Sequence, residues 1–359
     1  MRTFNFFILI ILTTIYCLQA TDTYSQKLFS NESPVDTTYI IDYTDRITAR
    51  LYSSIKFTNV YVVDNSLDET LHYKPNDNLN LGFGANYKFI GLNIGLNFPF
   101  INNRDHDKYG NTKYLDLQSH LYMRKHVIDF IGQFYRGYYL ENSDHAIKNF
   151  PKDKYYIRPD IKTTSLGLVY NYVFNHKKYS YRAAFLQNEW QKKSAGSFLL
   201  GGNVYNVVTK ADSSIVPSNI NYVNFIDSVN FNQSYQFGLG VNGGYAHTFV
   251  IKSKLFFAIS ATIGVGFGGV RLHQETEASR EDIDVTFTAQ LRGGFGYNSE
   301  KYYVGVSYVN LLSQNQLGIP EAWLGFSTGN FRVNLVRRFT LNKPITLESV
   351  KDLFRKKEQ

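Results

Sequence analysis

Histidine and serine side chains are the first candidates for chemistry in this chain. Nucleophilic catalysis needs a serine beside a histidine, with an acid or an amide that orients the imidazole. The histidines considered are His120, His126 and His247, and His247 alternates onto the apolar side of its segment. No serine forms a recognisable catalytic signature with them, so interfacial or loop histidines are the competing interpretation. We therefore expect no enzyme, and we keep a lipid-modifying enzyme that uses His247 as a third hypothesis.

Two acidic pairs, Asp105/Asp107 and Glu275/Glu277, could offer oxygen ligands to a divalent cation. Neither pair matches a known calcium loop, and solvated loop charge is the competing interpretation. We expect no metal and no cofactor.

Glycines alternate with larger residues at 82/84, 238/240 and 264/266/268. A dinucleotide-binding fingerprint needs glycines between a strand and a helix, and no helix pattern follows these. They indicate packing room inside a sheet, or sheet curvature.

Basic residues on the polar face of alternating segments are the best functional clue. Inside a barrel such residues set ion preference or bind an anion. The competing interpretation is a plugged interior in which they pair with Asp and Glu from other strands. Because the basic residues are scattered, they do not predict nucleic-acid binding. The candidates are Arg46, Arg50, Lys56, Lys88, Arg292 and Arg332.

Apolar and polar residues alternate along segments that run through the whole chain. Many segments span about 10–18 residues, whereas soluble strands are usually about 5–6 and a tilted membrane strand needs about 9–11. Aromatics gather near segment ends, at Tyr138-Tyr139, Tyr155-Tyr156, Tyr302-Tyr303 and Trp323, as in the aromatic girdles of membrane barrels. A secreted β-sandwich is the alternative. Segments with this alternation include 47–57, 79–89, 92–98, 115–121, 165–172, 235–245, 255–267, 286–295 and 331–335.

Lipid cannot hydrogen-bond a free strand edge, so a sheet in a bilayer closes on itself. We predict an all-β, transmembrane antiparallel β-barrel over residues 41–341. The alternating segments number about 13–14, and because such barrels usually have an even number of strands, we predict about twelve, with a range of about ten to fourteen. Short connections near 90–91, 124–126, 175–178, 252–254 and 298–301 are predicted periplasmic turns. Longer ones, at 64–78, 100–111, 141–160, 209–232 and 272–284, are predicted surface loops. Residues 178–208 do not fit this order, because they resemble two strands and the extra crossing would reverse the sides of all later connections. Either they form one long kinked strand, or some of the turns lie on the other side of the membrane.

The two ends differ from the middle. Residues 1–20 have a positive start, a short apolar run and a small residue at the cut, which predicts a cleaved signal peptide; a single membrane anchor is the alternative. Removal of this leader takes away Cys17, the one cysteine, and changes the formal charge from +8 to +7, because Arg2 is its one charged residue. Residues 21–40 are expected to be a periplasmic lead-in. Residues 342–359 are expected to be a tail with a short helix, or a frayed end.

Three segments carry a family resemblance: DRITARLYSSIKF (45–57), YKPNDNLNLGFGANYKFIGLNIGLNFPF (73–100) and QKKSAGSFLLGG (191–202). Together they resemble an uncharacterised family of Bacteroidetes outer-membrane proteins, a domain of unknown function, and the resemblance covers most of the mature chain. It implies the barrel and its compartment, and it brings no activity, ligand or catalytic residue.

The leading hypothesis is a non-enzymatic barrel of the cell outer membrane that forms a narrow, porin-like passage for small anionic solutes. The second is a structural or adaptor barrel that anchors a partner through its long loops or its C-terminal helix. Expected partners are outer-membrane lipid, the barrel-assembly machinery and, for the first hypothesis, the solute.

Overall fold

The computed structural model describes residues 34–87, 90–98, 102, 106–274 and 279–341. The predicted signal peptide, most of the predicted lead-in, the C-terminal helix and Lys88 lie outside these residues. Among the described residues, no helix is long and apolar enough to cross a membrane.

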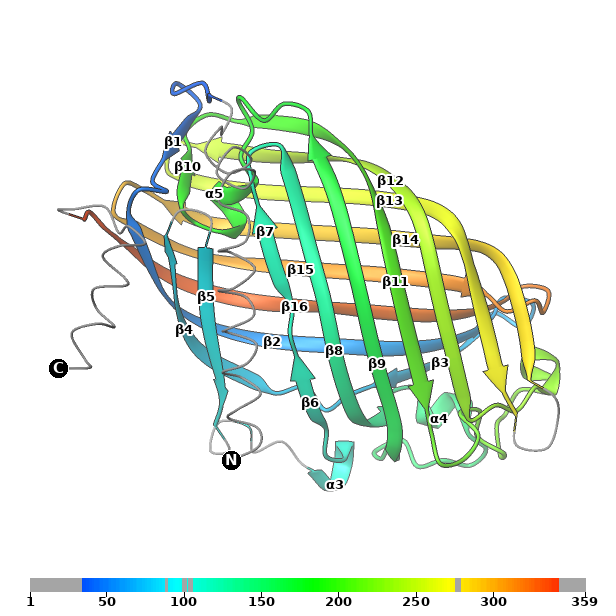
Figure 1. The fold of residues 1–359 in the computed structure, drawn as a ribbon. Coiled ribbons are helices and arrows are strands. Elements are labelled where there is room, and N and C mark those ends of the chain that lie inside the picture. The colour runs from blue at the N-terminus through cyan, green and yellow to red at the C-terminus, as the bar shows by residue number, and fades with distance from the viewer. Residues whose placement is uncertain (1–33, 88–89, 99–101, 103–105, 275–278, 342–359) are drawn as a thin grey trace, which may run out of the picture. The chain divides into compact units, whose positions relative to one another are not determined.

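Ten antiparallel strands form a closed ring (Figure 1). The ring closes where β16 pairs with β2 along the full length of both, from Ala322 with Asp64 to Phe339 with Ile47. This ladder leaves no free edge between the first and the last strand of the ring, which is the usual reason for a barrel. The ten strands, in chain order, are β2 (Ile47–Asp64), β3 (Glu69–Lys74), β8 (His126–Leu140), β9 (Tyr156–Val173), β11 (Ala195–Lys210), β12 (Gln233–Ile251), β13 (Leu255–His273), β14 (Arg280–Asn298), β15 (Tyr302–Gln316) and β16 (Ala322–Phe339).

Four further strands flank the short strand β3. Strands β4 (Leu79–Tyr87) and β5 (Ile90–Asn97) form the predicted hairpin, and β4 pairs with the first half of β2. Strands β6 (Lys113–Asp116) and β7 (Ser119–Tyr122) pair with β8. Twelve strands are therefore not confirmed: the ring has ten, and these four lie between β2 and β8 along the first half of β2, which the short strand β3 does not reach.

The alternation sorts side chains as predicted, with apolar ones outside and polar ones inside. On strand β13, Ile263 is 75% exposed, while Thr262 next to it is 3% exposed. The same two-residue period places the two members of a tyrosine pair on opposite faces of the sheet. Tyr302 is outside and half-exposed, but Tyr303 is fully buried inside, so only one member of this pair could belong to an aromatic girdle.

Short and long connections lie at opposite ends of the barrel. The turns at 123–125, 252–254 and 299–301 share the end where β2 begins, here called the turn end. The connections at 141–155 and 211–232 lie at the other end, the loop end. The predicted loops at 141–160 and 209–232 thus lie at the end opposite these turns, while the predicted loop at 64–78 is wrong, because it contains strand β3. The side of the membrane that each end faces stays a prediction.

The two interpretations of residues 178–208 are both wrong. Only β11 crosses the barrel, and residues 179–191 fold back into the turn end as helix α5 (Tyr181–Phe185) and strand β10 (Glu189–Gln191) (Figure 1). Strand β10 pairs with β1 (Ile40–Asp42) in a separate two-stranded sheet. We call residues 179–191 the turn-end insert. Because the insert does not cross the barrel, the order of turns and loops is preserved.

Buried charge holds the turn-end insert in place. The Glu189 carboxylate accepts a hydrogen bond from the Ser180 hydroxyl at 2.5 Å and lies 3.3 Å from the guanidinium groups of Arg124 and Arg182. Burial raises the pKa of Glu189, although both arginines act against this. Arg338 of β16 donates to the carbonyls of Gln187 and Glu189. An acid buried among partners of this kind is costly to move, so the insert is a fixed part of the barrel.

Apolar packing fills the loop end. Residues of the 211–232 loop, including Phe225 and Ile226 of the 3-10 helix η1 (Phe225–Ser228), are buried against the inner faces of the strands. The Tyr73 hydroxyl donates to the carbonyl of Ile215 at 2.5 Å, which ties this loop to β3. Packed residues therefore cover both ends of the barrel, and they would have to move before a solute could pass through it.

Candidate functional site

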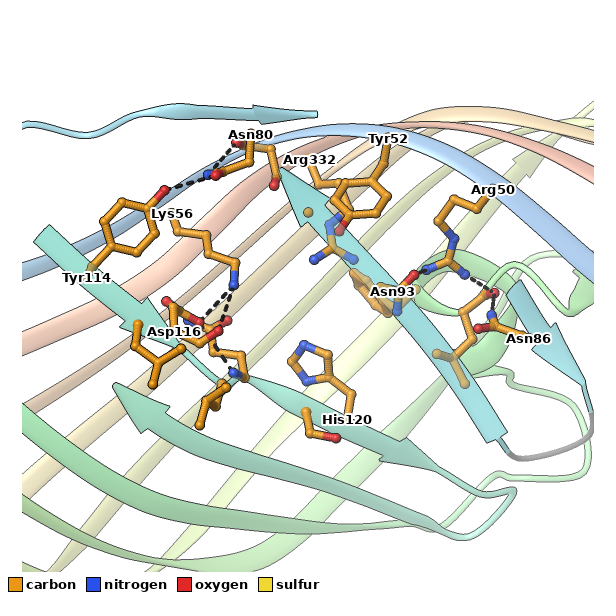
Figure 2. Close-up of a pocket in the computed structure, with 18 of the residues that line it drawn as sticks. Arg50, Tyr52, Lys56, Asn80, Asn86, Asn93, Tyr114, Asp116, His120 and Arg332 are labelled. Carbon is orange, nitrogen blue, oxygen red and sulfur yellow. Dashed lines mark hydrogen bonds and ion pairs between the residues drawn. The ribbon is translucent and has the colours of Figure 1, made fainter. Parts of the chain in front are cut away.

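A cavity of about 770 Å³ lies inside the barrel, toward the turn end (Figure 2). Its walls come from β2, β4, β5, β6, β7 and β16, with Phe185 and Leu186 of the turn-end insert. The volume is in the range of small-molecule sites. The lining carries four cations, Arg50, Lys56, Lys113 and Arg332, and one acid, Asp116.

Arg50 reaches into the cavity from β2 and meets neutral acceptors. Its Nη2 donates to the carbonyl of Leu186 at 2.9 Å, and its Nη1 lies 3.4 Å from Oδ1 of Asn93 on β5. The Asn86 amide also donates to the carbonyl of Leu186, at 2.9 Å. Within the part of the chain that the structure describes, no carboxylate pairs with Arg50, so its charge is left uncompensated.

Arg332 of β16 lies against an aromatic ring. Its guanidinium carbon is 4.8 Å from the centre of the Tyr52 ring, a cation–π distance. Its Nε is buried without a hydrogen-bond partner in the structure. Among the described residues it makes no ion pair, so it is, with Arg50, the second inward-facing guanidinium in the cavity without a carboxylate (Figure 2). Lys113 also lines the cavity without an ion pair among these residues, but its side chain is exposed.

Two glycines make room for the Tyr52 ring. Gly82 of β4 is paired with Tyr52, and Gly95 of β5 is paired with Gly82, so the three form one row across the sheet. A Cβ on Gly82 would come within 2.3 Å of the Tyr52 ring, and one on Gly95 within 3.1 Å of its hydroxyl. The predicted role of Gly82 as packing room is confirmed, and through Tyr52 it positions Arg332.

Lys56 is neutralised, unlike the two arginines. Its ammonium donates to Oδ1 of Asp116 on β6 at 2.9 Å. The other oxygen of Asp116 accepts hydrogen bonds from Gln133 at 2.7 Å and from the Tyr135 hydroxyl at 3.1 Å. The acid is thus fully engaged, and the excess positive charge of the cavity interior comes from Arg50 and Arg332.

A second charged group spans the barrel beside the cavity. Asp129 of β8 pairs with Arg292 of β14, and both side chains are almost completely buried. Nδ1 of His120, on β7, lies 2.7 Å from Oδ1 of Asp129. The same oxygen accepts a hydrogen bond from the Tyr122 hydroxyl at 3.2 Å. His120 is therefore oriented by an acid at the wall of the cavity.

The six basic candidates separate into four groups. Arg50, Lys56 and Arg332 meet in the cavity, and Arg292 is the buried partner of Asp129. Arg46 lies before β2 at the turn end, 3.3 Å from Glu300, so it is not a residue of the lumen. Lys88 falls outside the described residues. Lys56 and Arg292 pair with acids, as the interpretation of a plugged interior expects, while Arg50 and Arg332 have no carboxylate partner among the described residues.

The other histidine candidates lie away from the cavity. Nδ1 of His126 is 2.9 Å from the Tyr170 hydroxyl, near the turn end. His247 stacks beside Phe249, with ring centres 4.2 Å apart. The sequence hypothesis of an enzyme that uses His247 stays untested. The acidic pairs predicted as loop charge have at least one member outside the described residues, and the described residues contain no cluster of three metal-ligating side chains.

Several cavity residues were not singled out from the sequence. Asn80, Asn86 and Asn93 are inward-facing amides on β4 and β5, and alternation alone gave their face but no role. Leu186 contributes a backbone carbonyl, which leaves no mark in a residue pattern. Taken together, two uncompensated guanidinium groups with amides around them can bind an anion, since guanidinium suits phosphate, sulfate and carboxylate oxygens.

Solved structures with a similar fold are outer-membrane β-barrels. The outer membrane protease OmpT from Escherichia coli is 9% identical, with a TM-score of 0.37, and the match covers 85% of this chain and 100% of that one. Ail of Yersinia pestis, in complex with a heparin analogue, is 10% identical, with a TM-score of 0.19 and coverage of 81% and 99%. OpdQ from Pseudomonas aeruginosa is 10% identical, with a TM-score of 0.20 and coverage of 81% and 98%. These values are too low to assign an activity.

No curated protein matches the sequence. A family model, described as Domain of unknown function (DUF4421), matches residues 34–339, which is most of the chain. This confirms the resemblance to a family without a known activity, while the Bacteroidetes origin stays a prediction. The chain therefore belongs to this domain-of-unknown-function family.

Proposed function

We propose that this chain is an outer-membrane β-barrel that binds a small anionic ligand in the cavity lined by Arg50 and Arg332. The location is supported by the closed ring, by the polar interior and by the band of exposed aliphatic and aromatic side chains on most strands. A lipid-facing band of this kind, opposite a polar lumen, is typical of transmembrane barrels. The apolar run at 1–20 supports export.

The observation that carries the binding proposal is the pair of guanidinium groups without a carboxylate. A buried charge is usually paired, because removing it from water is costly. The other two buried cations of the six candidates, Lys56 and Arg292, follow this rule. Arg50 and Arg332 lack such a partner in the described structure, and an anionic ligand would supply one.

Binding is better supported than free passage. The turn-end insert and the 211–232 loop pack inside opposite ends of the barrel. A continuous channel requires both to move, while a ligand in the cavity requires neither. The adaptor hypothesis keeps the long loops as its surface, but no described feature favours one partner.

Inorganic phosphate is the simplest probe of the cavity. We expect saturable binding of radiolabelled phosphate to the full chain in lipid nanodiscs, measured by equilibrium dialysis at fixed ionic strength. Arg332→Gln removes one charged hydrogen-bond donor, worth about 1.5–3 kcal/mol, so binding should weaken by about tenfold to a hundredfold. Arg332→Lys keeps the charge without the planar donor pair, so it should lose less.

Arg337→Gln is the matched control, because Arg337 lies on the same strand but is exposed and stacks on Phe339 at 4.9 Å. It should leave phosphate binding unchanged. Folding of each variant is checked by its gel mobility without heating. Absence of saturable phosphate binding to the folded wild type, or equal losses in both glutamine variants, would contradict the proposal.

A further inference from the structure

The barrel wall contains a line along which the described strands do not pair. Strand β5 pairs with β4 on one side, and β6 and β7 pair with β8. Among the described residues, no ladder joins β5 to β6 or β7, although the three strands line one cavity. We call this line the seam. It lies in the turn-end half of the barrel, since β4 is paired with the first half of β2 and β5 with β4 (Figure 1).

The cavity reaches the outside of the barrel through the seam. Asp116 and Gln118 face inward, and Leu115 and Leu117 alternate with them on the outer face, 49% and 52% exposed. All four line the same cavity. Because alternate side chains of an extended segment point to opposite faces, a cavity that touches both faces passes through the wall at this point.

The seam is closed toward the loop end. The Tyr114 hydroxyl on β6 donates to Oδ1 of Asn80 on β4 at 2.9 Å. Beyond it, the Asn76 amide donates to the carbonyl of Gly110 at 2.8 Å, and the Asn76 backbone N–H to the Thr112 hydroxyl at 2.8 Å. These bonds leave the turn-end part of the seam as the opening.

The rim and the interior of the opening differ in chemistry. Outside, both edges carry exposed aliphatic side chains, Ile94 and Leu96 on β5 with Leu115 and Leu117 on the other edge. Inside are the two uncompensated guanidinium groups described above. An opening that faces hydrocarbon slows the entry of a small hydrophilic anion, because the anion first has to cross lipid; equilibrium dialysis still measures its affinity. A molecule that is already dissolved in the bilayer meets no such barrier.

We infer that the ligand is an amphiphile with an anionic head group, which enters sideways through the seam. Its head group binds Arg50 and Arg332, and its hydrocarbon tail lies along Ile94, Leu96, Leu115 and Leu117. This rests on the proposed function, because it assigns the ligand class of the same cavity. It adds two elements that phosphate binding alone does not require: a contribution of the tail and a role of the seam.

Dodecyl phosphate and inorganic phosphate separate these elements. Both are titrated against the wild-type chain in nanodiscs of zwitterionic phosphatidylcholine, with empty nanodiscs as the blank for partition into lipid. Dodecyl phosphate should bind at least about tenfold more tightly than inorganic phosphate, since the tail adds apolar contact. Arg332→Gln should weaken both probes.

The seam is tested from its rim. Leu96→Asn should weaken dodecyl phosphate binding by about fivefold or more and leave phosphate binding unchanged, because Leu96 lies on the rim and outside the cavity lining, so that only the tail contact is altered. Leu117→Asn, on the opposite edge, should likewise weaken dodecyl phosphate binding. Ile263→Asn, an exposed aliphatic position on β13 away from the seam, is the matched control and should change neither probe.

The outcomes distinguish the two proposals. Equal affinities of the wild type for the two phosphates would overturn the tail contribution and leave anion binding intact. If the rim variants and Ile263→Asn weakened dodecyl phosphate binding equally, the inferred role of the seam would be wrong. A wild type that binds neither probe would overturn the proposed function itself.

Discussion

Asp129→Asn is expected to lower the free energy of unfolding by about 3–5 kcal/mol, which is the usual cost of leaving one member of a buried ion pair alone. Arg292, the partner, has a fully buried side chain, and Asp129 is 4% exposed at its side chain. The asparagine keeps the size of the side chain and can still accept hydrogen bonds from His120 and Tyr122. The lost charge therefore accounts for most of the effect. Urea unfolding of the chain in lipid vesicles measures it, with Trp190 and Trp323 as fluorophores.

Two comparisons test whether the loss of stability in Asp129→Asn comes from the buried ion pair. Asp153→Asn, an exposed acid between α4 (Ser143–Ala146) and β9, should change the free energy of unfolding by less than about 0.5 kcal/mol. The double variant Asp129→Asn with Arg292→Gln should recover much of the loss, because neither charge is then left alone. An exposed ion pair is worth only about 0–1 kcal/mol. A small effect of Asp129→Asn would thus show a water-filled lumen around this pair, in conflict with a packed interior.

Ile263→Arg is expected to lower the free energy of unfolding by about 2–4 kcal/mol in a bilayer, the cost of an arginine on the lipid face near the midplane. Ile263 is 75% exposed and near the centre of β13, which spans Leu255–His273. Substitution of an exposed residue costs little in water, so the effect depends on lipid around the strand. Refolding into vesicles at increasing urea concentrations measures this free energy of unfolding.

The depth dependence provides the controls for this substitution. Ile283 is 83% exposed on β14 but near its loop-end start, so Ile283→Arg should cost about 0–1 kcal/mol, as at the membrane interface. Val223 is 76% exposed in the 211–232 loop, and Val223→Arg should cost less still. If the three arginine substitutions lowered the free energy of unfolding equally, β13 would not be surrounded by a bilayer.

The inward and outward faces could be predicted from the sequence because the strand period is a local property. Each of Leu51, Phe237 and Phe331 was assigned to the apolar face from its immediate neighbours, and each is exposed outside the barrel. The same local rule gave the basic candidates Arg50, Lys56, Arg292 and Arg332 on the inner face; in the structure Arg50 and Arg292 are buried, and Lys56 and Arg332 line the cavity.

Contacts between distant segments could not be predicted in this way. Asp129 and Arg292 are 163 positions apart, and Lys56 and Asp116 are 60 apart, so no local pattern distinguishes the paired cations from the unpaired ones. Arg50 and Arg332 share a cavity because the ring closes between β2 and β16. From the sequence alone, the two arginines could be grouped only as residues of the polar face of their strands.

The strand number and the turn-end insert were missed for a related reason. Strands β4 to β7 have the same alternation as ring strands, and only their pairing leaves them outside the ring. Residues 179–191 contain apolar and polar residues in short runs that resemble strands. Their position follows from the buried contacts of Glu189 with Arg124 and with Arg338, which join three separate parts of the chain.

Single-channel recording in planar bilayers is the most direct test of a barrel that binds a ligand in a closed-ended interior. Folded wild-type chain, inserted at defined copy number, should give no steady ion conductance, because the turn-end insert and the 211–232 loop fill the two ends. Persistent, ohmic conductance from the folded protein would contradict this and would favour an open passage for anions.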